Sequence, residues 1–414
     1  MKVLFITHCT GMAGANRSML QLIIELRNEY DVDPFVLLPY DNSDSRTLRH
    51  YLVDENIEFI EVAIPYFKST YITREYRLDF VHHFHDFYRL SERLKEMNFD
   101  LIHSNSSVID FGGYLSHWLG IKHIWHLRDF GDLDYGLHSI WGKAYEKATY
   151  ANGDAYIAIS DAVKKHFEKI IPSKKIHTIY NGICPKDDVP RAPHNNEMVQ
   201  FLCAGVICEA KNQMEIVKAV DILVNKHKMT KFHLTIVGIG GGQYLDNMRN
   251  YAKSHEIENY ITFAEPVDGI EQLASTMDVG IMSSCCEAFG RVTVEYMLQR
   301  LAVIANDNGA NKEIVNDGIT GLLYPHGSVV SLADNMERLI KDRTLLSMLG
   351  NNGRNDALKR FLSRRNTKAI YDLYIEELGK PKSSSISNKL LLSKGVMAIL
   401  HIKDVLAELR KTIF

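Results

Sequence analysis

Two glutamates stand on either side of an Ala-Phe-Gly turn in the stretch EAFGRVTVE, Glu287 to Glu295. The preceding DVGIMSS has the apolar character of a strand, and the following RVTVEYMLQR has helical spacing. Gly290 therefore begins a helix, whose first free N–H groups suit an anion such as a phosphate. Carboxylates repel phosphate but accept hydrogen bonds from pairs of sugar hydroxyls. The pattern predicts a nucleotide-sugar site with one glutamate on each sugar.

These residues also have a purely structural interpretation. SCCE, Ser284 to Glu287, fits a capping box, in which the glutamate only satisfies a backbone donor at the start of the helix. On these residues alone both interpretations stay open.

Other loops bear on the choice. GVICEAKNQ places Lys211 after a strand and before a helix, where its ammonium could meet a diphosphate, although a lone lysine is usually a solvated surface residue. TIVGIGGG ends a strand with glycines that let a backbone approach a ligand. From Gly238 on, these glycines miss the G-x-G-x-x-G spacing, which disfavours a dinucleotide oxidoreductase.

The first half of the chain holds a similar arrangement. HCTGMAGANRSML has the order strand, Gly-rich loop, helix, and WHLRD ends a strand with His126. This imidazole can form hydrogen bonds or carry a proton near neutral pH, or it can be a satisfied core histidine. HHFH, His82 to His85, has no second ligand cluster, so no metal site is predicted.

Short apolar strands alternate with amphipathic helical stretches along almost the whole chain, which predicts βαβ units and parallel sheets. A proline-containing stretch of low apolar content interrupts this alternation at 184–198. We therefore predict an α/β protein with two doubly wound domains, residues 1–183 and 199–362, joined by a linker. Ligands bind outside the carboxyl ends of such strands, so we expect a central cleft between the two domains.

Composition limits the class of protein. At 414 residues the chain is too long for one core, and its 46% hydrophobic content is that of a globular protein. A net charge of −3 argues against a nucleic-acid partner. The six cysteines form no C-x-x-C pair, and we find neither a signal peptide nor a membrane-length apolar run. We expect a cytoplasmic protein with reduced thiols.

EAFGRVTVE resembles the E-x7-E motif of the family-four retaining glycosyltransferases. Further pieces resemble that family in the same order over about residues 1–380: GMAGA, IHSNS, WHLRD, ISDAVKKHF, YNGI, GVICEAKN, IVGIGGG, NGANKEIV and DGITGLLY. The resemblance implies a GT-B fold, with two Rossmann-like domains facing a central cleft. The second domain would hold the nucleotide-sugar donor and the first the acceptor. Residues 363–380 would form a helix that packs back on the first domain.

The resemblance also implies roles for individual residues. Glu295 would bind the ribose hydroxyls and Glu287 the donor sugar, while Lys211 would neutralise the diphosphate and His126 would touch the sugar near the reacting carbon. His126, Lys211 and Glu287 are thus the expected catalytic residues. The expected donor-binding set is Gly14, Gly205, Lys211, Gly238, Glu287, Phe289, Gly290, Arg291 and Glu295. The expected acceptor-side residues are Gly11, Ala13 and Asn105, and the Gly11–Ala15 loop would close over the phosphates.

Two positions depart from the family pattern. Val206 stands where an arginine is usual, so Lys211 lacks its usual cationic partner, and Asn105 replaces the second histidine after His103. We expect Arg291, beside the helix start, to supply the missing charge. The implied enzyme transfers a sugar from a UDP-sugar donor to a saccharide or lipid-linked saccharide, as in bacterial surface polysaccharide synthesis. The resemblance implies no cofactor and no metal. The alternatives are a sugar-nucleotide epimerase of the same fold and a non-catalytic partner subunit.

The C-terminal stretch predicts a further contact. In 381–414 a Ser-rich linker precedes an amphipathic helical pattern. From Lys389 on, the sequence has five Lys or Arg residues and two acidic residues, Asp404 and Glu408, which gives a net charge of 5 − 2 = +3. A basic amphipathic helix can lie on an anionic bilayer, so 389–414 predicts peripheral attachment at the inner face of the membrane. Packing on the chain itself or in a homo-oligomer is the alternative.

Overall fold

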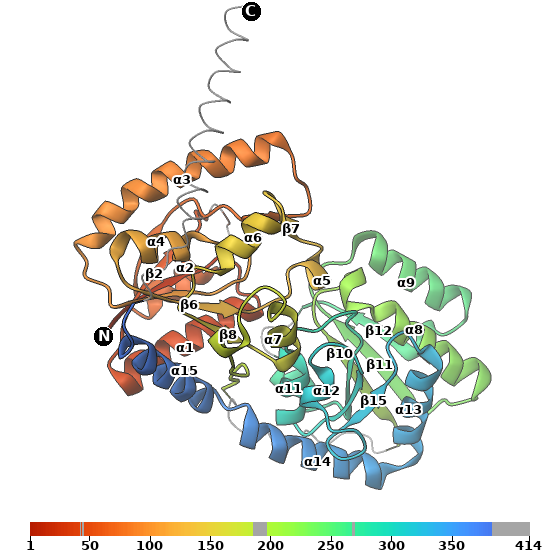
Figure 1. The fold of residues 1–414 in the computed structure, drawn as a ribbon. Coiled ribbons are helices and arrows are strands. Elements are labelled where there is room, and N and C mark those ends of the chain that lie inside the picture. Colours follow the sequence, from red (N-terminus) through yellow and green to blue (C-terminus); the bar gives the residue numbers. More distant parts are fainter. Residues whose placement is uncertain (42, 44, 185–196, 267–269, 383–414) are drawn as a thin grey trace, which may run out of the picture. The chain divides into compact units, whose positions relative to one another are not determined.

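The computed structural model describes residues 1–41, 43, 45–184, 197–266 and 270–382. The chain divides into two compact units (Figure 1). Unit 1 comprises Met1–Ile179 and the segment from Asn366 on, and unit 2 comprises Tyr180–Arg365. Most of the linker expected at 184–198 lies outside the described residues, as does the tail from 383 on.

Unit 1 is built on a seven-stranded parallel sheet in the order β3-β2-β1-β5-β6-β8-β9. Its strands are β1 (Lys2–Ile6), β2 (Asp33–Leu38), β3 (Glu58–Glu61), β5 (Leu101–Ser104), β6 (Lys122–Leu127), β8 (Ala155–Ala158) and β9 (Ile176–Thr178). A separate antiparallel pair joins β4 (Lys68–Ser69) to β7 (His138–Ser139). The sequence had not predicted this pair, because two-residue strands carry no readable alternation.

Helices cover both faces of this sheet. They are α1 (Gly14–Tyr30), α2 (Leu48–Asp54), α3 (Arg74–Lys95), α4 (Phe111–Leu119), α5 (Asp132–Tyr135), α6 (Lys143–Tyr150), α7 (Asp161–Phe167) and α15 (Ser363–Leu378), with a 3-10 turn at Ser173–Lys175. Figure 1 shows α3 and α4 on one face and α1 and α15 on the other. Along β1, Val3 and Phe5 join one core and Leu4 joins the other, because successive strand side chains point to opposite faces. The strand is therefore apolar throughout.

Unit 2 has a six-stranded parallel sheet in the order β12-β11-β10-β13-β14-β15. Its strands are β10 (Val199–Ala204), β11 (Phe232–Val237), β12 (Ile261–Ala264), β13 (Val279–Met282), β14 (Ala302–Asn306) and β15 (Leu322–Tyr324). Its helices are α8 (Gln213–Asp221, continued by a π-helical turn, Ile222–Lys226), α9 (Gly242–Ser254), α10 (Glu271–Ala274), α11 (Arg291–Leu298), α12 (Asn311–Ile314), α13 (Val329–Lys341) and α14 (Arg343–Arg360), with 3-10 turns at Glu209–Lys211 and Glu258–Tyr260.

Both sheets reverse their strand order at one strand. In unit 1 this is β1, which lies between β2 and β5, and in unit 2 it is β10, which lies between β11 and β13. In open parallel sheets, ligands bind outside the carboxyl ends of the strands at such a switch point. The prediction of two doubly wound α/β domains is confirmed, and the fold places the predicted site loops at the carboxyl ends of these two strands and of the strands beside them.

Candidate active site

In unit 2, Lys211 and Glu287 lie side by side at the switch point. Lys211 ends the 3-10 turn after β10, and Glu287 lies in the loop between β13 and α11. The loops are joined directly, since the Ser283 hydroxyl donates to the Lys211 carbonyl at 2.8 Å and the Cys285 N–H donates to the Ala210 carbonyl at 2.9 Å. The Lys211 Nζ atom lies 2.9 Å from Glu287 Oε2. Residues far apart in sequence thus form one charged pair.

Glu287 also holds the start of α11. Its Oε1 atom accepts a hydrogen bond from the Gly290 N–H at 3.1 Å, while Oε2 meets the lysine. Gly290 is the N-cap residue with φ 83°, a left-handed conformation that favours glycine. The Ser284 hydroxyl bonds to Met282 Sδ at 3.2 Å and does not cap the helix. The capping-box interpretation of Ser284–Glu287, one of the two that the sequence left open, is therefore wrong for Ser284, although the glutamate does satisfy a backbone donor.

The second glutamate is paired as well. Glu295 Oε1 lies 3.1 Å from Arg291 Nε, one turn earlier on α11, and the two side chains are 20% and 24% exposed. The candidate donor site therefore contains two carboxylates and two cations whose charges cancel. A bound diphosphate would depend on rearranging these pairs and on the backbone N–H groups at the helix start.

Gly238 is required by the close packing of two strand ends, whereas Gly205 is favoured by its backbone φ of 146°. A Cβ atom on Gly238 would stand 1.7 Å from the Gly205 carbonyl oxygen. The pairing of β10 with β11 continues beyond the strands, since the Ile207 N–H donates to the Ile239 carbonyl at 2.9 Å. Val206, at the position where the family has an arginine, is 55% exposed.

The third strand-end loop, after β14, fastens the Glu287 loop from the other side. The Ala310 N–H donates to the Glu287 carbonyl at 2.8 Å, and the amide of the fully buried Asn306 donates to the Ser284 carbonyl at 2.8 Å. From the sequence we identified NGANKEIV only as a resembling piece and missed Asn306, whose signal is a polar side chain at the end of an apolar strand. Phe289 is 3% exposed and packs near Tyr180 and Phe361, so only its backbone could face a donor.

In unit 1, a buried asparagine shapes the Gly11 loop. Asn16 Oδ1 accepts from the Thr7 hydroxyl at 2.6 Å, and its Nδ2 donates to the carbonyls of Cys9 and Gly11 at 2.8 and 2.9 Å. Ala13 is the N-cap of α1, which begins at Gly14. A Cβ atom on Gly11 would meet nothing within 4 Å, so the fold does not demand a glycine there. Asn16 was not predicted from the sequence.

His126 lies at the end of β6 in a fully buried histidine pair. Its Nδ1 atom is 3.1 Å from His103 Nε2, and His103 Nδ1 is 2.6 Å from the Tyr374 hydroxyl on α15. Burial, and then the nearby Arg128 guanidinium, hold the pKa of both imidazoles well below the usual range. Both rings are therefore neutral at ordinary pH, and His126 can offer a hydrogen bond but not a proton from a charged form. Its buried Nε2 atom has no hydrogen-bond partner among the described residues.

Asn105 is buried at the end of β5 and links three elements. Its Oδ1 accepts from Arg128 Nε at 2.7 Å, and its Nδ2 donates to the Ala15 carbonyl at 3.3 Å. The amide thus orients the guanidinium that faces the histidine pair. The unit 1 candidates Gly11, Ala13, Asn105 and His126 accordingly gather along the carboxyl ends of β1, β5 and β6.

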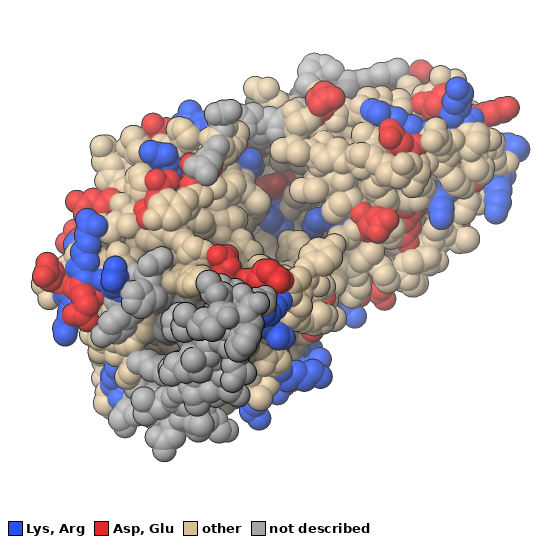
Figure 2. Space-filling view, turned by 90° about the horizontal axis from the view of Figure 1, so that it is seen from above, with Lys and Arg blue, Asp and Glu red and all other residues tan. Residues whose placement is uncertain are grey.

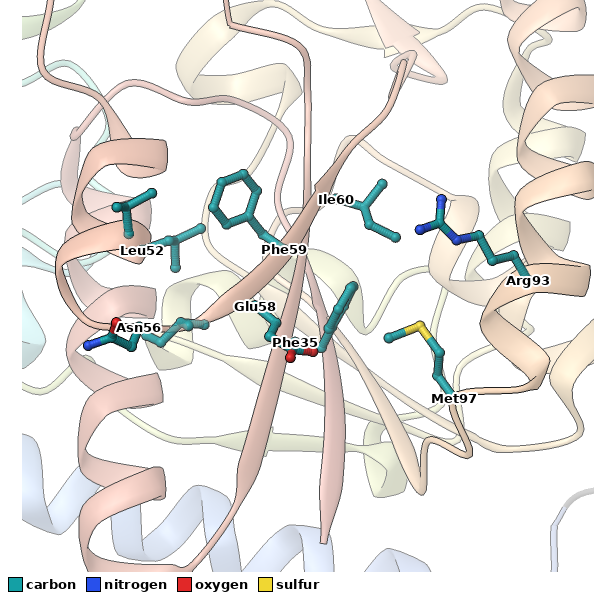
Figure 3. Close-up of a pocket in the computed structure, with 10 residues that line it drawn as sticks. Phe35, Leu52, Asn56, Glu58, Phe59, Ile60, Arg93 and Met97 are labelled. Carbon is teal, nitrogen blue, oxygen red and sulfur yellow. The ribbon is translucent and has the colours of Figure 1, made fainter.

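Two other features lie away from these strand ends. His227, Asp334 and Glu337 place one ligand atom each within 4.8 Å of one another, on α13 and just after the π-helical turn. In unit 1, a groove of about 380 Å³ runs beside the edge strand β3 (Figure 3). The groove is lined mainly by apolar side chains of β2, α2 and β3, together with Arg93 and Met97 from the end of α3. It contains none of the predicted site residues.

Comparison with known proteins gives consistent matches. The family model described as "Glycosyltransferase Family 4" matches residues 12–187, and "Glycosyl transferases group 1" matches residues 186–356. An uncharacterized glycosyltransferase of Methanocaldococcus jannaschii is 26% identical over 293 residues, 70% of this chain and 79% of its own length. The O-antigen biosynthesis glycosyltransferase WclY of Escherichia coli is 25% identical over 318 residues, 74% and 80% of the two chains.

A solved structure shares the fold. The crystal structure of Anabaena HepE in complex with UDP and glucose superposes with a TM-score of 0.73 at 19% identity, covering 91% of this chain and 100% of HepE. Among the residues that the structure describes, no helix has the length and apolar content needed to cross a membrane.

Proposed function

The chain belongs to the group 1, family 4 glycosyltransferases, and from this premise we propose that it transfers a sugar from a UDP-sugar to a saccharide or lipid-linked saccharide, with retention of configuration. The observation that carries the proposal is the joined arrangement of Lys211, Glu287 and the Gly290 N-cap at the switch point of unit 2. UDP bound to HepE and the O-antigen role of WclY support this donor and this acceptor class. We also propose that the reaction needs no metal.

The chemistry follows from the charge that develops during transfer. The departing nucleoside diphosphate gains negative charge, which Lys211 and the first N–H groups of α11 can stabilise. Glu287 can accept hydrogen bonds from donor-sugar hydroxyls and Glu295 from the ribose. Family membership supports retention.

The deciding experiment incubates the protein with radiolabelled UDP-, GDP- and ADP-sugars, with and without short neutral oligosaccharides and with EDTA present. We expect release of UDP from one UDP-sugar and labelled oligosaccharide when an acceptor is added. A sugar-nucleotide epimerase would instead yield isomeric UDP-sugars or free sugar without an acceptor. Binding without turnover would indicate a non-catalytic partner subunit, the alternative raised by Val206. Loss of activity in EDTA would contradict metal independence.

We further propose that the protein works at the cytoplasmic face of the membrane, attached through 389–414. These residues lie outside the described part of the chain, so the support is their basic amphipathic sequence. On the face shown in Figure 2, Lys and Arg side chains are mixed with Asp and Glu. The basic sequence of the tail makes it the candidate for attraction to anionic lipid.

A further inference from the structure

Four large apolar or aromatic side chains are exposed on two adjoining loops of unit 1. They are Tyr71 (81% exposed), Tyr135 (64%), Leu133 (58%) and Ile72 (42%). We call these four residues the tyrosine rim. Water-exposed tyrosine rings are normal singly, but a group on neighbouring loops marks a candidate interaction surface.

The two loops are held together by the small β4–β7 sheet. Lys68 pairs with Ser139 and Ser69 with His138, and the antiparallel register carries Tyr71 towards Gly136. The Thr70 methyl group lies 4.0 Å from where a Cβ atom on Gly136 would stand. Tyr71 and Tyr135 are therefore presented from adjacent backbones.

Each loop has a fixed internal shape. The Tyr71 N–H donates to Ser69 Oγ at 3.1 Å, and that hydroxyl donates to the Tyr71 carbonyl at 2.9 Å. The Leu137 N–H donates to the Gly131 carbonyl at 2.9 Å, which closes the turn around α5. Little conformational freedom would be lost when a ligand settles on such a surface.

The rim adjoins the catalytic edge of the unit 1 sheet. The loop carrying Tyr135 follows His126 and Arg128 at the end of β6. The loop carrying Tyr71 follows Tyr66, whose hydroxyl donates to the His8 carbonyl just beyond β1 at 2.8 Å. The loop carrying Tyr135 therefore leaves from the end of β6, and the loop carrying Tyr71, which follows β3 and β4, is held beside the end of β1 through Tyr66.

The charges around the rim favour an uncharged ligand. In residues 68–77 and 131–138 the charged side chains are Lys68, Arg74 and Arg77 against Glu75, Asp132 and Asp134. These charges balance, so the rim offers no net attraction to an anionic bilayer or a phosphate. Asp134 takes no direct part in a surface contact, because its Oδ1 atom is buried and its Oδ2 atom accepts from the Phe130 N–H at 2.9 Å.

We propose that the tyrosine rim binds an uncharged sugar unit of the acceptor, with the tyrosine rings against the apolar face of the sugar. The inference rests on the proposed function and extends it, because it selects a neutral saccharide as the part of the acceptor that is recognised. Tyrosine suits this task because it combines a large rigid apolar surface with a polar tip.

The test compares Tyr71→Ala and Tyr135→Ala with wild type and with Ile375→Ala, a control at a residue that is 50% exposed on α15. The probes are short neutral oligosaccharides of glucose, galactose and N-acetylglucosamine and their carboxylated counterparts. We expect about a tenfold rise in acceptor KM for each tyrosine variant, a fall in the ratio of transfer to donor hydrolysis, and wild-type values for the control.

Saturation-transfer NMR with the same oligosaccharides, without any donor, separates this inference from the proposed function. Oligosaccharide contact that the tyrosine variants lose would support the rim even if no transferase activity were found. Unchanged acceptor KM and NMR contact in both variants would overturn it, as would preferential binding of the carboxylated probes. Loss of anionic-vesicle binding in the variants, with sugar contact retained, would also overturn it in favour of a membrane surface.

Discussion

At the scale of single residues, the two cations of the candidate donor site are each paired with a glutamate, so these four side chains carry no net charge. Lys211 forms an ion pair with Glu287, and Arg291 forms one with Glu295. Each cation would therefore share its charge between a carboxylate and a bound phosphate. Arg291 was expected to replace the charge that is missing at Val206. Its ion pair with Glu295 leaves that expectation untested, since a small rotation of the side chain would redirect the guanidinium.

Replacing each cation tests this compensation. If the Arg291 guanidinium stabilises the negative charge of the diphosphate, Arg291→Ala should lower kcat/KM by about 10- to 100-fold, because a charged hydrogen bond contributes about 1.5–3 kcal/mol. Lys211→Ala should cost at least as much. Wild-type turnover in Arg291→Ala together with an inactive Lys211→Ala would contradict the idea. Arg249, an exposed residue of α9, supplies the control in Arg249→Ala.

A buried carboxyl group in unit 1 makes a separate prediction about pH. Burial raises the pKa of Asp110 to about 7, and its Oδ2 accepts a hydrogen bond from the Tyr145 hydroxyl at 2.7 Å. A carboxyl whose pKa is raised on folding stabilises the fold below its unfolded pKa of about 4, and this stability is lost as pH rises through 7.

Asp110→Asn removes this titration while it keeps an oxygen for Tyr145. Relative to the variant, the wild type should lose stability between pH 4 and 7, by at most about 1.4 kcal/mol per pH unit. Urea unfolding at pH 5 and pH 8 measures the difference. A stability gap that is the same at both values would show that Asp110 does not titrate in this range. Asp317→Asn is the control, at a carboxyl in an exposed loop of unit 2.

At the scale of elements, three strand-end loops of unit 2 hold one another. The β13–α11 loop is bonded to the loop after β10 through Ser283 and to the loop after β14 through Asn306. Two loop glycines differ in whether a side chain would fit at their position. At Gly238 of unit 2 a Cβ atom would collide with the Gly205 carbonyl, whereas at Gly11 of unit 1 it would meet open space.

Two alanine substitutions use this difference. Gly238→Ala should destabilise unit 2 by about 1–3 kcal/mol or more, because the new methyl group forces the ends of β10 and β11 apart. Gly11→Ala should leave stability within about 0.5 kcal/mol of wild type. If the Gly11 loop contacts substrate, that variant should still lose activity, as measured by transfer assays beside thermal unfolding. An unaltered melting temperature in Gly238→Ala would contradict the packing argument.

The sequence predicted most of the architecture because the strands are short apolar runs with clear breaks between them. Periodicity located β1, β10 and β13, and the helical spacing of RVTVEYMLQR located the start of α11. It could not locate Asn16 or Asn306, whose hydrogen bonds reach backbone atoms in other segments. At Ser284 the local motif left a capping box open as an alternative, and the structure excludes it because Gly290 is the N-cap residue of α11.

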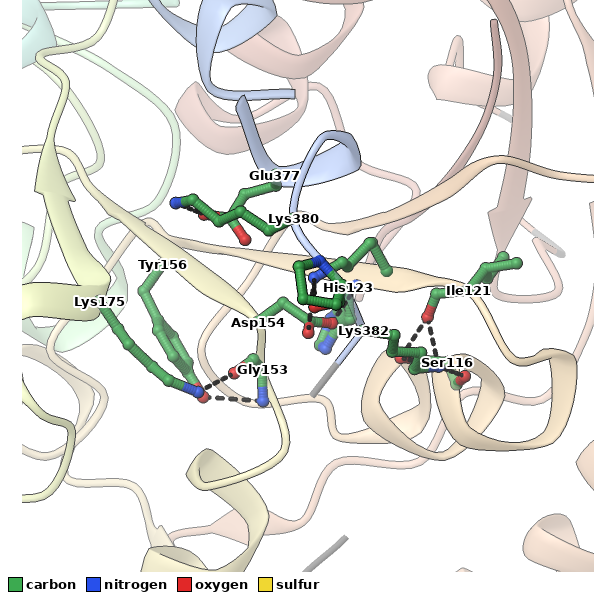
Figure 4. A network of polar contacts seen from close by, with 12 residues as sticks. Ser116, Ile121, His123, Gly153, Asp154, Tyr156, Lys175, Glu377, Lys380 and Lys382 are labelled. Atoms are coloured by element: carbon green, nitrogen blue, oxygen red, sulfur yellow. Dashed lines mark hydrogen bonds and ion pairs between the residues drawn. The ribbon is translucent and has the colours of Figure 1, made fainter. Parts of the chain in front are cut away.

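At the scale of the whole chain, the described residues end at an anchor on unit 1. Lys382 Nζ donates to the carbonyls of Ser116 and Ile121, and Lys122 Nζ donates to the Pro381 carbonyl at 3.1 Å (Figure 4). Lys122 begins β6, whereas His126 lies near the other end of that strand. The tail therefore departs from the amino end of β6, opposite the acceptor-side residues, about 13 Å from His126 at about 3.3 Å per residue.

This exit point changes what a membrane-bound tail would do. A tail leaving from the far edge acts as a tether that raises the local concentration of a lipid-linked acceptor, rather than as a surface that presents the catalytic edge. Deleting the tail should therefore raise the apparent KM for a vesicle-embedded acceptor and leave the kinetics on a water-soluble acceptor unchanged.

The deletion is best made after Lys382, because this keeps the anchor intact. Flotation with vesicles containing anionic lipid should recover the full-length protein but not the shortened chain, and high salt should release the full-length protein because screening weakens attraction to the +3 tail. A chain that ends at Lys380 serves as a comparison, since losing the contacts of Pro381 and Lys382 should lower its melting temperature as well. Equal flotation of full-length and shortened protein would assign the tail to packing within the chain or to a homo-oligomer.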